Sequence, residues 1–176
     1  MSTRSNYARR QEASQRTTSC SRFRRAAANR CRQPPGVRQN GQVARIRDLV
    51  FDSPRPSSIA RFWAAALDGY AVAPYDDAEL ARLRAKGITD IMDDPSVLVE
   101  PSGSTAFASD RRPRLFFQLV PESKVVKNRV HLDLSADDPV AEVARLTELG
   151  ATVAAEHEHL TVLLDPDGNE FCLSRR

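Results

Sequence analysis

Residues 45–69 show two hydrophobic periods in succession. In "RIRDLVFD" (45–52), Leu49 and Phe51 fall on one side and Asp48, Val50 and Asp52 on the other, and this period of two predicts a strand with one buried face. After a turn rich in serine and proline, apolar residues recur every three or four positions, which predicts an amphipathic helix that ends at Gly69. Ser57 or Ser58 can cap its start. The apolar positions of the helix are Ile59, Phe62, Trp63, Ala66 and Leu67.

The same pattern of a strand, a turn and an amphipathic helix recurs 83 residues later. In "NRVHLDLSADDP" (128–139) the apolar Leu132 and Leu134 alternate with His131 and Asp133, with Val130 on the apolar side. "SADD" offers a helix cap, and an amphipathic helix follows, with Gly150 at its end. The apolar positions of this second helix are Val140, Val143, Ala144 and Leu146.

The two copies align through their prolines. Asp48 lies eight positions before Pro56, and His131 lies eight positions before Pro139. Asp48 and His131 therefore occupy matching places in an internal repeat.

Each copy continues with three further strands. In the second copy the tight turn "DPDGN" (165–169) joins the last two of them. In the first copy a short helix ending at Gly87 is inserted after the second strand. The pattern predicts an α+β fold of two tandem βαβββ modules, at residues 45–121 and 127–174.

The net charge of the chain comes from its N-terminal segment. Of 26 basic and 23 acidic residues, residues 1–44 hold ten arginines and a single acid, so residues 45–176 are acidic. The segment is poor in apolar residues and is predicted to be disordered. A non-native extension or an organelle transit peptide would each explain it. It has no apolar stretch of the length found in secretory signals.

Several classes of protein are not favoured by the sequence. No run of 18 apolar residues is present, so a membrane span is not expected. Cys20, Cys31 and Cys172 fit neither a disulfide framework nor a CxxC metal site, which favours a reducing, cytoplasmic setting. Because the basic charge is confined to residues 1–44, a nucleic-acid partner is not favoured for the folded part.

The repeated modules resemble a known superfamily. The segments that carry the resemblance are "ARFWAAALDGY" (60–70), "LFFQLVPESKVVKNRVHLDL" (115–134) and "LLDPDGNEFCL" (163–173). They are similar to the vicinal oxygen chelate superfamily, which includes glyoxalase I, bleomycin-resistance proteins and extradiol dioxygenases, and most of all to actinobacterial glyoxalase-like domain proteins. The resemblance implies a cupped mixed sheet with helices outside, and it leaves a homodimer open.

The resemblance also implies candidate metal ligands. In the superfamily, ligands come from the first and last strands of each module. Carried over by position, these are Asp48 and Gln118 in the first module and His131 and Glu170 in the second. The ion would be Zn, Ni, Mn, Fe or Co, acting as a Lewis acid, with Glu170 as a base. Asp48 is shorter than the ligand usual at this position.

Two functions follow from the resemblance. One is a metal-dependent lyase or isomerase of the glyoxalase type. The alternative is a metal-free protein that binds a small molecule, as drug-sequestering resistance proteins do, with His131 as a hydrogen-bonding residue of the pocket. A third hypothesis, tethering to nucleic acid, depends on residues 1–44 alone.

Other residues are better explained by structure than by chemistry. His157 and His159 could share one face of a strand and bind a metal, but their charged neighbours favour an exposed strand end. Trp63 is expected in the core. Cys172 is expected to pack inertly.

Overall fold

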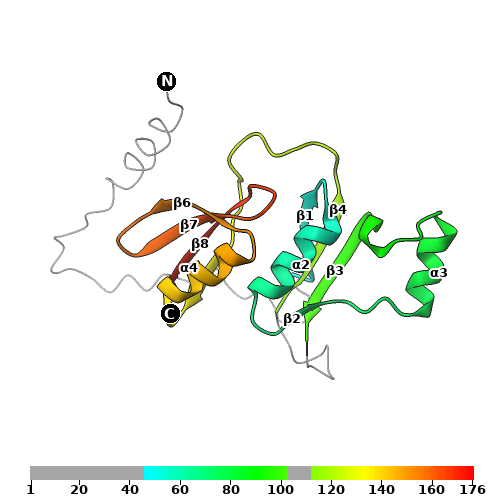
Figure 1. Cartoon of the computed structure of the whole chain (residues 1–176), viewed down its shortest axis with the longest axis horizontal. Helices are drawn as coiled ribbons and strands as arrows, with labels where there is room; N and C mark the ends of the chain where they lie inside the picture. The colour runs from blue at the N-terminus through cyan, green and yellow to red at the C-terminus, as the bar shows by residue number, and fades with distance from the viewer. Residues whose placement is uncertain (1–45, 103–111) are drawn as a thin grey trace, which may run out of the picture. The chain divides into compact units, whose positions relative to one another are not determined.

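The strands that the structure describes form two four-stranded mixed sheets, one from each module (Figure 1). The structure is a computed structural model that describes residues 46–102 and 112–176. These residues belong to one unit, Ala44–Arg176, and the predicted disordered segment lies outside them.

The elements of module one are β1 (Asp48–Ser53), α2 (Pro56–Ala66), β2 (Tyr70–Val72), α3 (Asp77–Ala85), η1 (Ile91–Asp93), β3 (Ser96–Pro101) and β4 (Arg114–Leu119). Those of module two are β5 (Asp133–Ala136), α4 (Pro139–Glu148), β6 (Thr152–Glu156), β7 (Leu160–Leu164) and β8 (Glu170–Arg175).

The two sheets have the same topology. Their strand orders are β1-β4-β3-β2 and β5-β8-β7-β6. In each sheet the first strand pairs in parallel with the last, and the remaining pairs are antiparallel. The predicted α+β fold with two βαβββ modules is therefore confirmed, and the helix α3 is the insertion predicted in module one.

The helices α2 and α4 begin at the two matched prolines, Pro56 and Pro139. Proline suits the first helical position because its fixed φ matches the helix and its missing N–H is not needed there. Asp138 caps α4, as predicted, by accepting hydrogen bonds from two backbone N–H groups. The prediction that Ser57 or Ser58 caps α2 is wrong. Both residues lie inside the first turn, and Ser57 is buried and donates to the Ile91 carbonyl at 3.0 Å.

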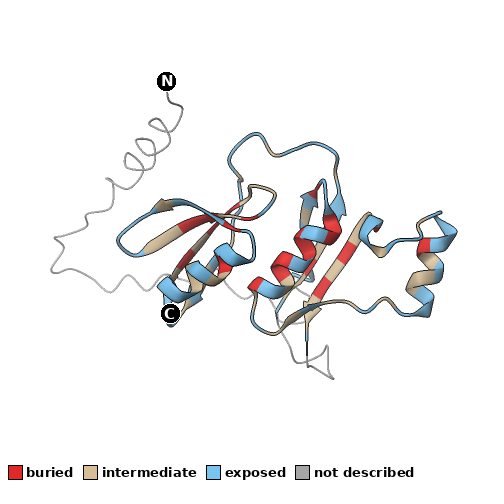
Figure 2. Cartoon of the chain, viewed as in Figure 1, coloured by how far each residue is buried: buried red, intermediate tan, exposed pale blue. Residues whose placement is uncertain are grey.

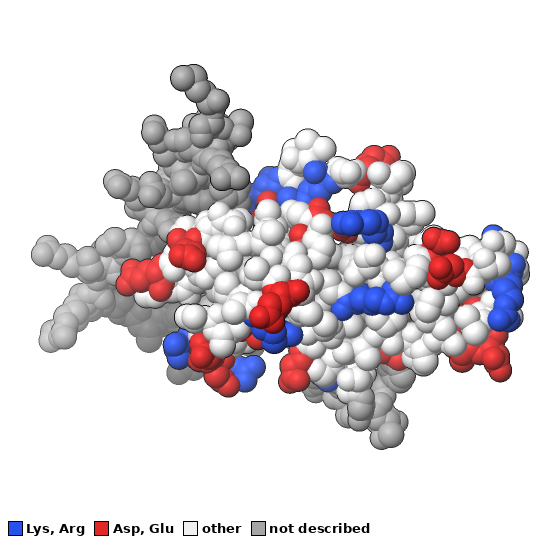
Figure 3. Space-filling model, in the orientation of Figure 1, with Lys and Arg blue, Asp and Glu red and all other residues white. Residues whose placement is uncertain are grey.

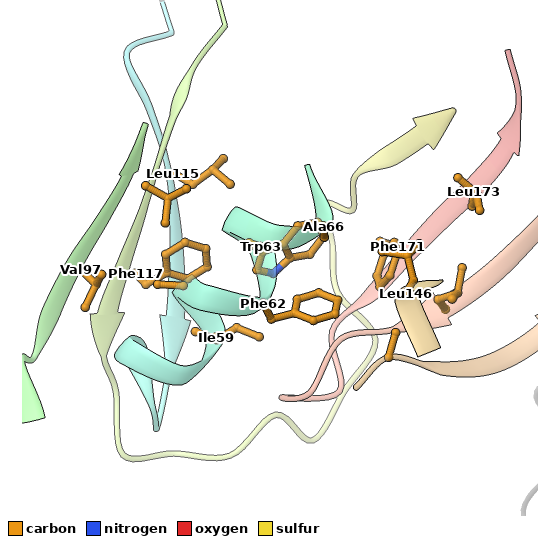
Figure 4. Packing of buried hydrophobic residues seen from close by; sticks show 14 residues of the cluster. Ile59, Phe62, Trp63, Ala66, Val97, Leu115, Phe117, Leu146, Phe171 and Leu173 are labelled. Atoms are coloured by element: carbon orange, nitrogen blue, oxygen red, sulfur yellow. The ribbon is translucent and has the colours of Figure 1, made fainter. Parts of the chain in front are cut away.

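The core is built around the aromatic face of α2 (Figure 4). Trp63 is 1% exposed, which confirms its predicted place in the core. Its ring lies 5.8 Å from Phe51 of β1 and 5.2 Å from Phe171 of β8. One helix thus buries apolar surface of both modules, and Figure 2 shows the buried residues on one side of α2 and along the central strands.

Polar contacts reinforce this join between the modules. The Trp63 indole N–H donates to the buried Asp165 carboxylate at 3.2 Å. The guanidinium of Arg145, in α4, donates to the carbonyls of Ala65 and Ala66 at 2.8 and 2.9 Å. These carbonyls end α2, where a cation is favourable because no backbone donor satisfies them.

Two predicted apolar faces end earlier than expected. Leu132 and Leu134 pack against the core, but Val130 is 77% exposed because β5 begins only at Asp133. In α4 only Leu146 is fully buried, while Val140 is 81% exposed. The sheet of module two is covered by the second half of α4, so the first turn of the helix extends past the core.

No helix within residues 46–102 and 112–176 is long and apolar enough to cross a membrane. On the face shown in Figure 3, acidic and basic side chains are interspersed among uncharged ones. Over the described part of this face no continuous basic surface is seen.

Candidate functional site

A cleft of about 410 Å³ lies where β1 and α2 of module one meet the start of β8 in module two. Apolar side chains from both modules form part of its wall, including Phe51, Trp63 and Phe171. The predicted site residues His131 and Glu170 both line it. The volume lies within the range of small-molecule sites in proteins.

Glu170 is the buried acid of the cleft. Its side chain is 7% exposed, and it contacts the Lys124 ammonium at 3.1 Å. The backbone N–H of Asn128 donates to the same carboxylate oxygen at 3.1 Å. Burial raises the pKa of Glu170, but the Asn128 N–H and the Lys124 ammonium outweigh it and hold the pKa below its ordinary value. Glu170 is therefore ionised at neutral pH.

Removing the Lys124 ammonium is expected to weaken the fold in a pH-dependent way. A carboxyl whose folded-state pKa is depressed contributes stability above its unfolded pKa, and loses it as pH falls through the folded pKa. We expect Lys124→Met to lower the free energy of unfolding by about 1–3 kcal/mol at neutral pH. The deficit should shrink as the pH falls below about 4.5, the ordinary pKa of the group.

Urea denaturation at neutral and acidic pH measures this effect. Glu170→Gln supplies the control, since in that background Lys124→Met should have little further effect. A deficit of equal size at both pH values, or one that persists with Gln at position 170, would contradict the ion-pair explanation.

His131 lies in the segment that leads into β5, two residues before the strand. Its imidazole is 42% exposed, and its Nε2 lies 3.3 Å from the Asp133 carboxylate. The amide nitrogen of Asn128 donates to the Asn169 side-chain oxygen at 3.2 Å, which ties the same segment to the turn before β8. The histidine therefore reaches the cleft from a chain segment held in place at both ends.

The strand register refines the predicted equivalences between the modules. Asp48 lies opposite Arg114 across β1 and β4. In module two Asp133 lies opposite Cys172, and its repeat counterpart Val50 lies opposite Phe116. Glu170 and Arg114 each lie two residues before those partners. Arg114 is thus the counterpart of Glu170 in module one. Gln118 lies four residues farther along β4, opposite Asp52, and donates a hydrogen bond to it at 2.8 Å.

Asp48 is enclosed by two arginines. The Arg114 and Arg47 guanidinium groups each donate to a different oxygen of its carboxylate, both at 2.7 Å. The hydrogen bond from Arg114 is the main cause of a lowered Asp48 pKa. Both oxygens are therefore already bound to cationic groups.

The four predicted ligands do not fit a single ion. Asp48 and Gln118 stand four residues apart along paired strands, which is roughly 13 Å. Ligands of one ion lie about 2 Å from it, and the arginines occupy both oxygens of Asp48. The structure brings His131 and Glu170 to one cleft, and Asp48 and Gln118 are not among the residues that line it.

Other parts of the site were not predicted from the sequence. Lys124 and Asn128 belong to the aperiodic link between the modules, so no pattern marked them. Cys172 was expected to be inert, and burial first, then the neighbouring Asp133 carboxylate, raise the pKa of its thiol. His157 and His159 lie in the hairpin between β6 and β7 and are exposed, as their charged neighbours predicted.

A larger hollow, about 730 Å³, lies between α3 and the sheet of module one. Leu98 and Phe116 form part of its apolar floor. The buried Asp94 carboxylate accepts a hydrogen bond from Tyr75 at 3.0 Å and contacts Arg82 at 3.5 Å. Burial, followed by the effect of Asp94, raises the pKa of Tyr75 to about 12. These polar groups satisfy one another and anchor α3 to the sheet.

Comparisons with known proteins agree with this fold. A family model described as a glyoxalase-like domain matches residues 48–174. A comparison with curated proteins gives no significant match.

Three solved structures to which the chain is similar are a glyoxalase/bleomycin resistance/dioxygenase family enzyme, a glyoxalase I and a fosfomycin resistance protein. A glyoxalase/bleomycin resistance protein/dioxygenase family enzyme from Burkholderia phytofirmans PsJN is 13% identical, with a TM-score of 0.50 over 75% of this chain and 98% of that one. The trypanothione-dependent glyoxalase I of Leishmania major is 18% identical, with a TM-score of 0.49 over 76% and 87%. The fosfomycin resistance protein FosX of Mesorhizobium loti is 13% identical, with a TM-score of 0.48 over 77% and 90%.

At 13% identity the Burkholderia phytofirmans structure bears on the fold alone. The family model, however, spans both modules from β1 to β8. The chain therefore belongs to the glyoxalase-like domain family.

Proposed function

We propose that the protein binds a small organic molecule in the cleft between its modules without using a metal for that binding. The observation that carries the proposal is the composition of the cleft, in which an aromatic wall from both modules meets His131, Asn128 and the ion-paired Glu170. Such a site suits a molecule with an apolar body and one end that forms hydrogen bonds.

The state of Glu170 supports binding over proton transfer. An efficient general base has a pKa near the working pH. The Asn128 N–H and Lys124 instead keep the pKa of Glu170 below its ordinary value. The carboxylate and its lysine therefore serve as a fixed polar pair that can orient a ligand, while the exposed His131 imidazole can donate or accept a hydrogen bond.

A metal-dependent lyase or isomerase is the second candidate, because His131 and Glu170 line one cleft. If the protein is such an enzyme, the ion would bind these two residues, and the ion pair between Glu170 and Lys124 would break. Asp48 and Gln118 would serve as polar residues outside the coordination shell. Metal dependence of ligand binding distinguishes the two candidates.

Trp63 supplies a direct readout, since it is the single tryptophan of the chain and it lines the cleft. A panel of small aromatic and aliphatic alcohols, amides and carboxylic acids would be titrated against its fluorescence. We expect His131→Ala to weaken the binding of molecules that change this fluorescence by about three- to tenfold, the loss of one hydrogen bond.

His159→Ala is the matched control, because His159 is exposed in a hairpin away from the cleft. It should leave binding unchanged. Binding that needs an added divalent ion and disappears with chelator would favour the lyase or isomerase instead. Binding that is insensitive to both His131→Ala and Glu170→Gln would place the ligand elsewhere.

A further inference from the structure

The hydrogen bonds of the Asp165 carboxylate fix the orientation of a side-chain amide in the cleft. The carboxylate accepts from the Trp63 indole N–H and from the backbone N–H groups of Asp167 and Asn169. The side-chain amide nitrogen of Asn169 also lies 3.2 and 3.1 Å from its two oxygens. Because a carboxylate accepts hydrogen bonds and does not donate them, the nitrogen of the Asn169 amide has to face it.

The amide of Asn169 orients the amide of Asn128 in turn. The Asn169 oxygen accepts a hydrogen bond at 3.2 Å from the side-chain nitrogen of Asn128. The nitrogen of Asn128 therefore lies on the Asn169 side, and its Oδ1 lies on the other. Within the described part of the chain, no group donates to this Oδ1. Both asparagines line the cleft, so the oxygen is placed to accept a hydrogen bond from a molecule bound there.

The other polar groups of the cleft share this acceptor character. Asp52 lines the cleft and is exposed, and the ionised Glu170 has its charge balanced by Lys124. The imidazole of His131 is able to donate or to accept. A ligand carboxylate would therefore meet the negative charge of Asp52 and the oxygen of Asn128, and neither of these offers it a positive charge.

We propose that the ligand of the cleft is a neutral or cationic molecule that donates an O–H or N–H hydrogen bond to Oδ1 of Asn128. Asn128 is then a specificity-determining residue, and Asp165 is a positioning residue that acts through Asn169. The inference rests on the proposed function, binding of a small organic molecule in this cleft. An alcohol, an amine or an amide with a free N–H meets the requirement. An ether would leave Oδ1 unpaired, which costs affinity because the oxygen loses its water on binding.

Two matched pairs of probes, titrated against the fluorescence of Trp63 in the full chain, test the proposal. Benzyl alcohol and benzyl methyl ether share the ring and the oxygen, and only the alcohol has a donor. Benzamide and benzoate share the ring and the carbonyl carbon, and only the amide has N–H groups and no charge. We expect the donor of each pair to bind about three- to tenfold more tightly than its partner, the effect of one hydrogen bond.

Variants separate hydrogen bonding from the sizes of the probes. The preference for the alcohol over the ether should disappear in Asn128→Ala and persist in Asn128→Asp, which keeps an acceptor oxygen. Asp165→Asn should reduce the preference, because an amide at this position is able to donate to Asn169 and allows both asparagine amides to turn over. The matched control, His159→Ala, should keep it. A general loss of stability would weaken binding of both probes and leave their ratio unchanged.

Hydrogen exchange in the ligand-free protein, followed by NMR, tests the amide orientation by itself. The side-chain N–H groups of Asn169 should exchange with water more slowly in the wild type than in Asp165→Asn. Equal exchange rates would overturn the inference, and so would a preference for the alcohol that survives Asn128→Ala in a protein that circular dichroism shows to be folded.

The two probe pairs also distinguish this inference from the proposed function. Binding of the ether and of benzoate as tight as that of their partners would overturn the inference and leave the proposed function standing. Slow exchange at Asn169 in a protein that binds neither these probes nor the wider panel would overturn the proposed function, and the ligand class inferred from it.

Discussion

Trp63→Ala is expected to destabilise the protein by about 3–5 kcal/mol, as large-to-small changes at buried aromatic positions do. The ring is 1% exposed and contacts three other aromatic rings, those of Phe51, Phe62 and Phe171. Because these come from both modules, the cavity would lie where the modules join. Natural domains have about 5–15 kcal/mol of stability in total, so the variant should be close to unfolding.

Urea denaturation followed by circular dichroism measures this change. Trp63→Phe is the informative control, because it keeps an aromatic ring in the cavity and removes only the outer ring and the indole N–H. It should lose clearly less stability than Trp63→Ala. Equal losses would mean that the hydrogen bond to Asp165, and not aromatic packing, dominates the contribution of Trp63.

The internal repeat made the fold predictable from the sequence. The equal spacing from Asp48 to Pro56 and from His131 to Pro139 corresponds in the structure to two helices that begin at those prolines. Predictions failed where an element ends, as at Val130 and Val140, because hydrophobicity cannot tell where the covering partner stops. The predicted serine cap of α2 was wrong for a related reason. Ser57 instead donates a hydrogen bond to the carbonyl of Ile91, which lies outside the helix.

The site was less predictable because it depends on pairing between strands. Alternation placed Glu170 and Cys172 on one face, but it does not give the residue opposite each of them. The register shows that Arg114, and not Gln118, is the counterpart of Glu170. Lys124 and Asn128 come from an aperiodic segment, and only the folded chain brings them to the carboxylate.

Asp165→Ala is the second change expected to have a large effect, about 2–4 kcal/mol of lost stability. Asp165 is 3% exposed and begins the "DPDGN" turn before β8. Its carboxylate accepts hydrogen bonds from the Trp63 indole at 3.2 Å and from the backbone N–H groups of Asp167 and Asn169 at 3.0 and 2.8 Å. Alanine would leave these donors without a partner in a buried setting, at about 1–3 kcal/mol for each one left unsatisfied.

Asp165→Asn separates the hydrogen bonds from the charge. The amide keeps one acceptor oxygen for the backbone N–H groups and removes the cost of burying a carboxylate, so its loss of stability should be smaller than that of Asp165→Ala. Burial raises the pKa of Asp165 above 3.8. This group therefore contributes stability that is fully present below that pH and is lost as pH rises through its folded-state pKa, the opposite sign to Glu170. Because Glu170 and other carboxyls titrate with the opposite sign, urea denaturation is compared between the wild type and Asp165→Asn at each pH. The difference in their free energies of unfolding should shift in favour of Asp165→Asn as the pH rises from acidic to neutral. Equal losses in Asp165→Asn and Asp165→Ala at neutral pH would show that the charge itself is required.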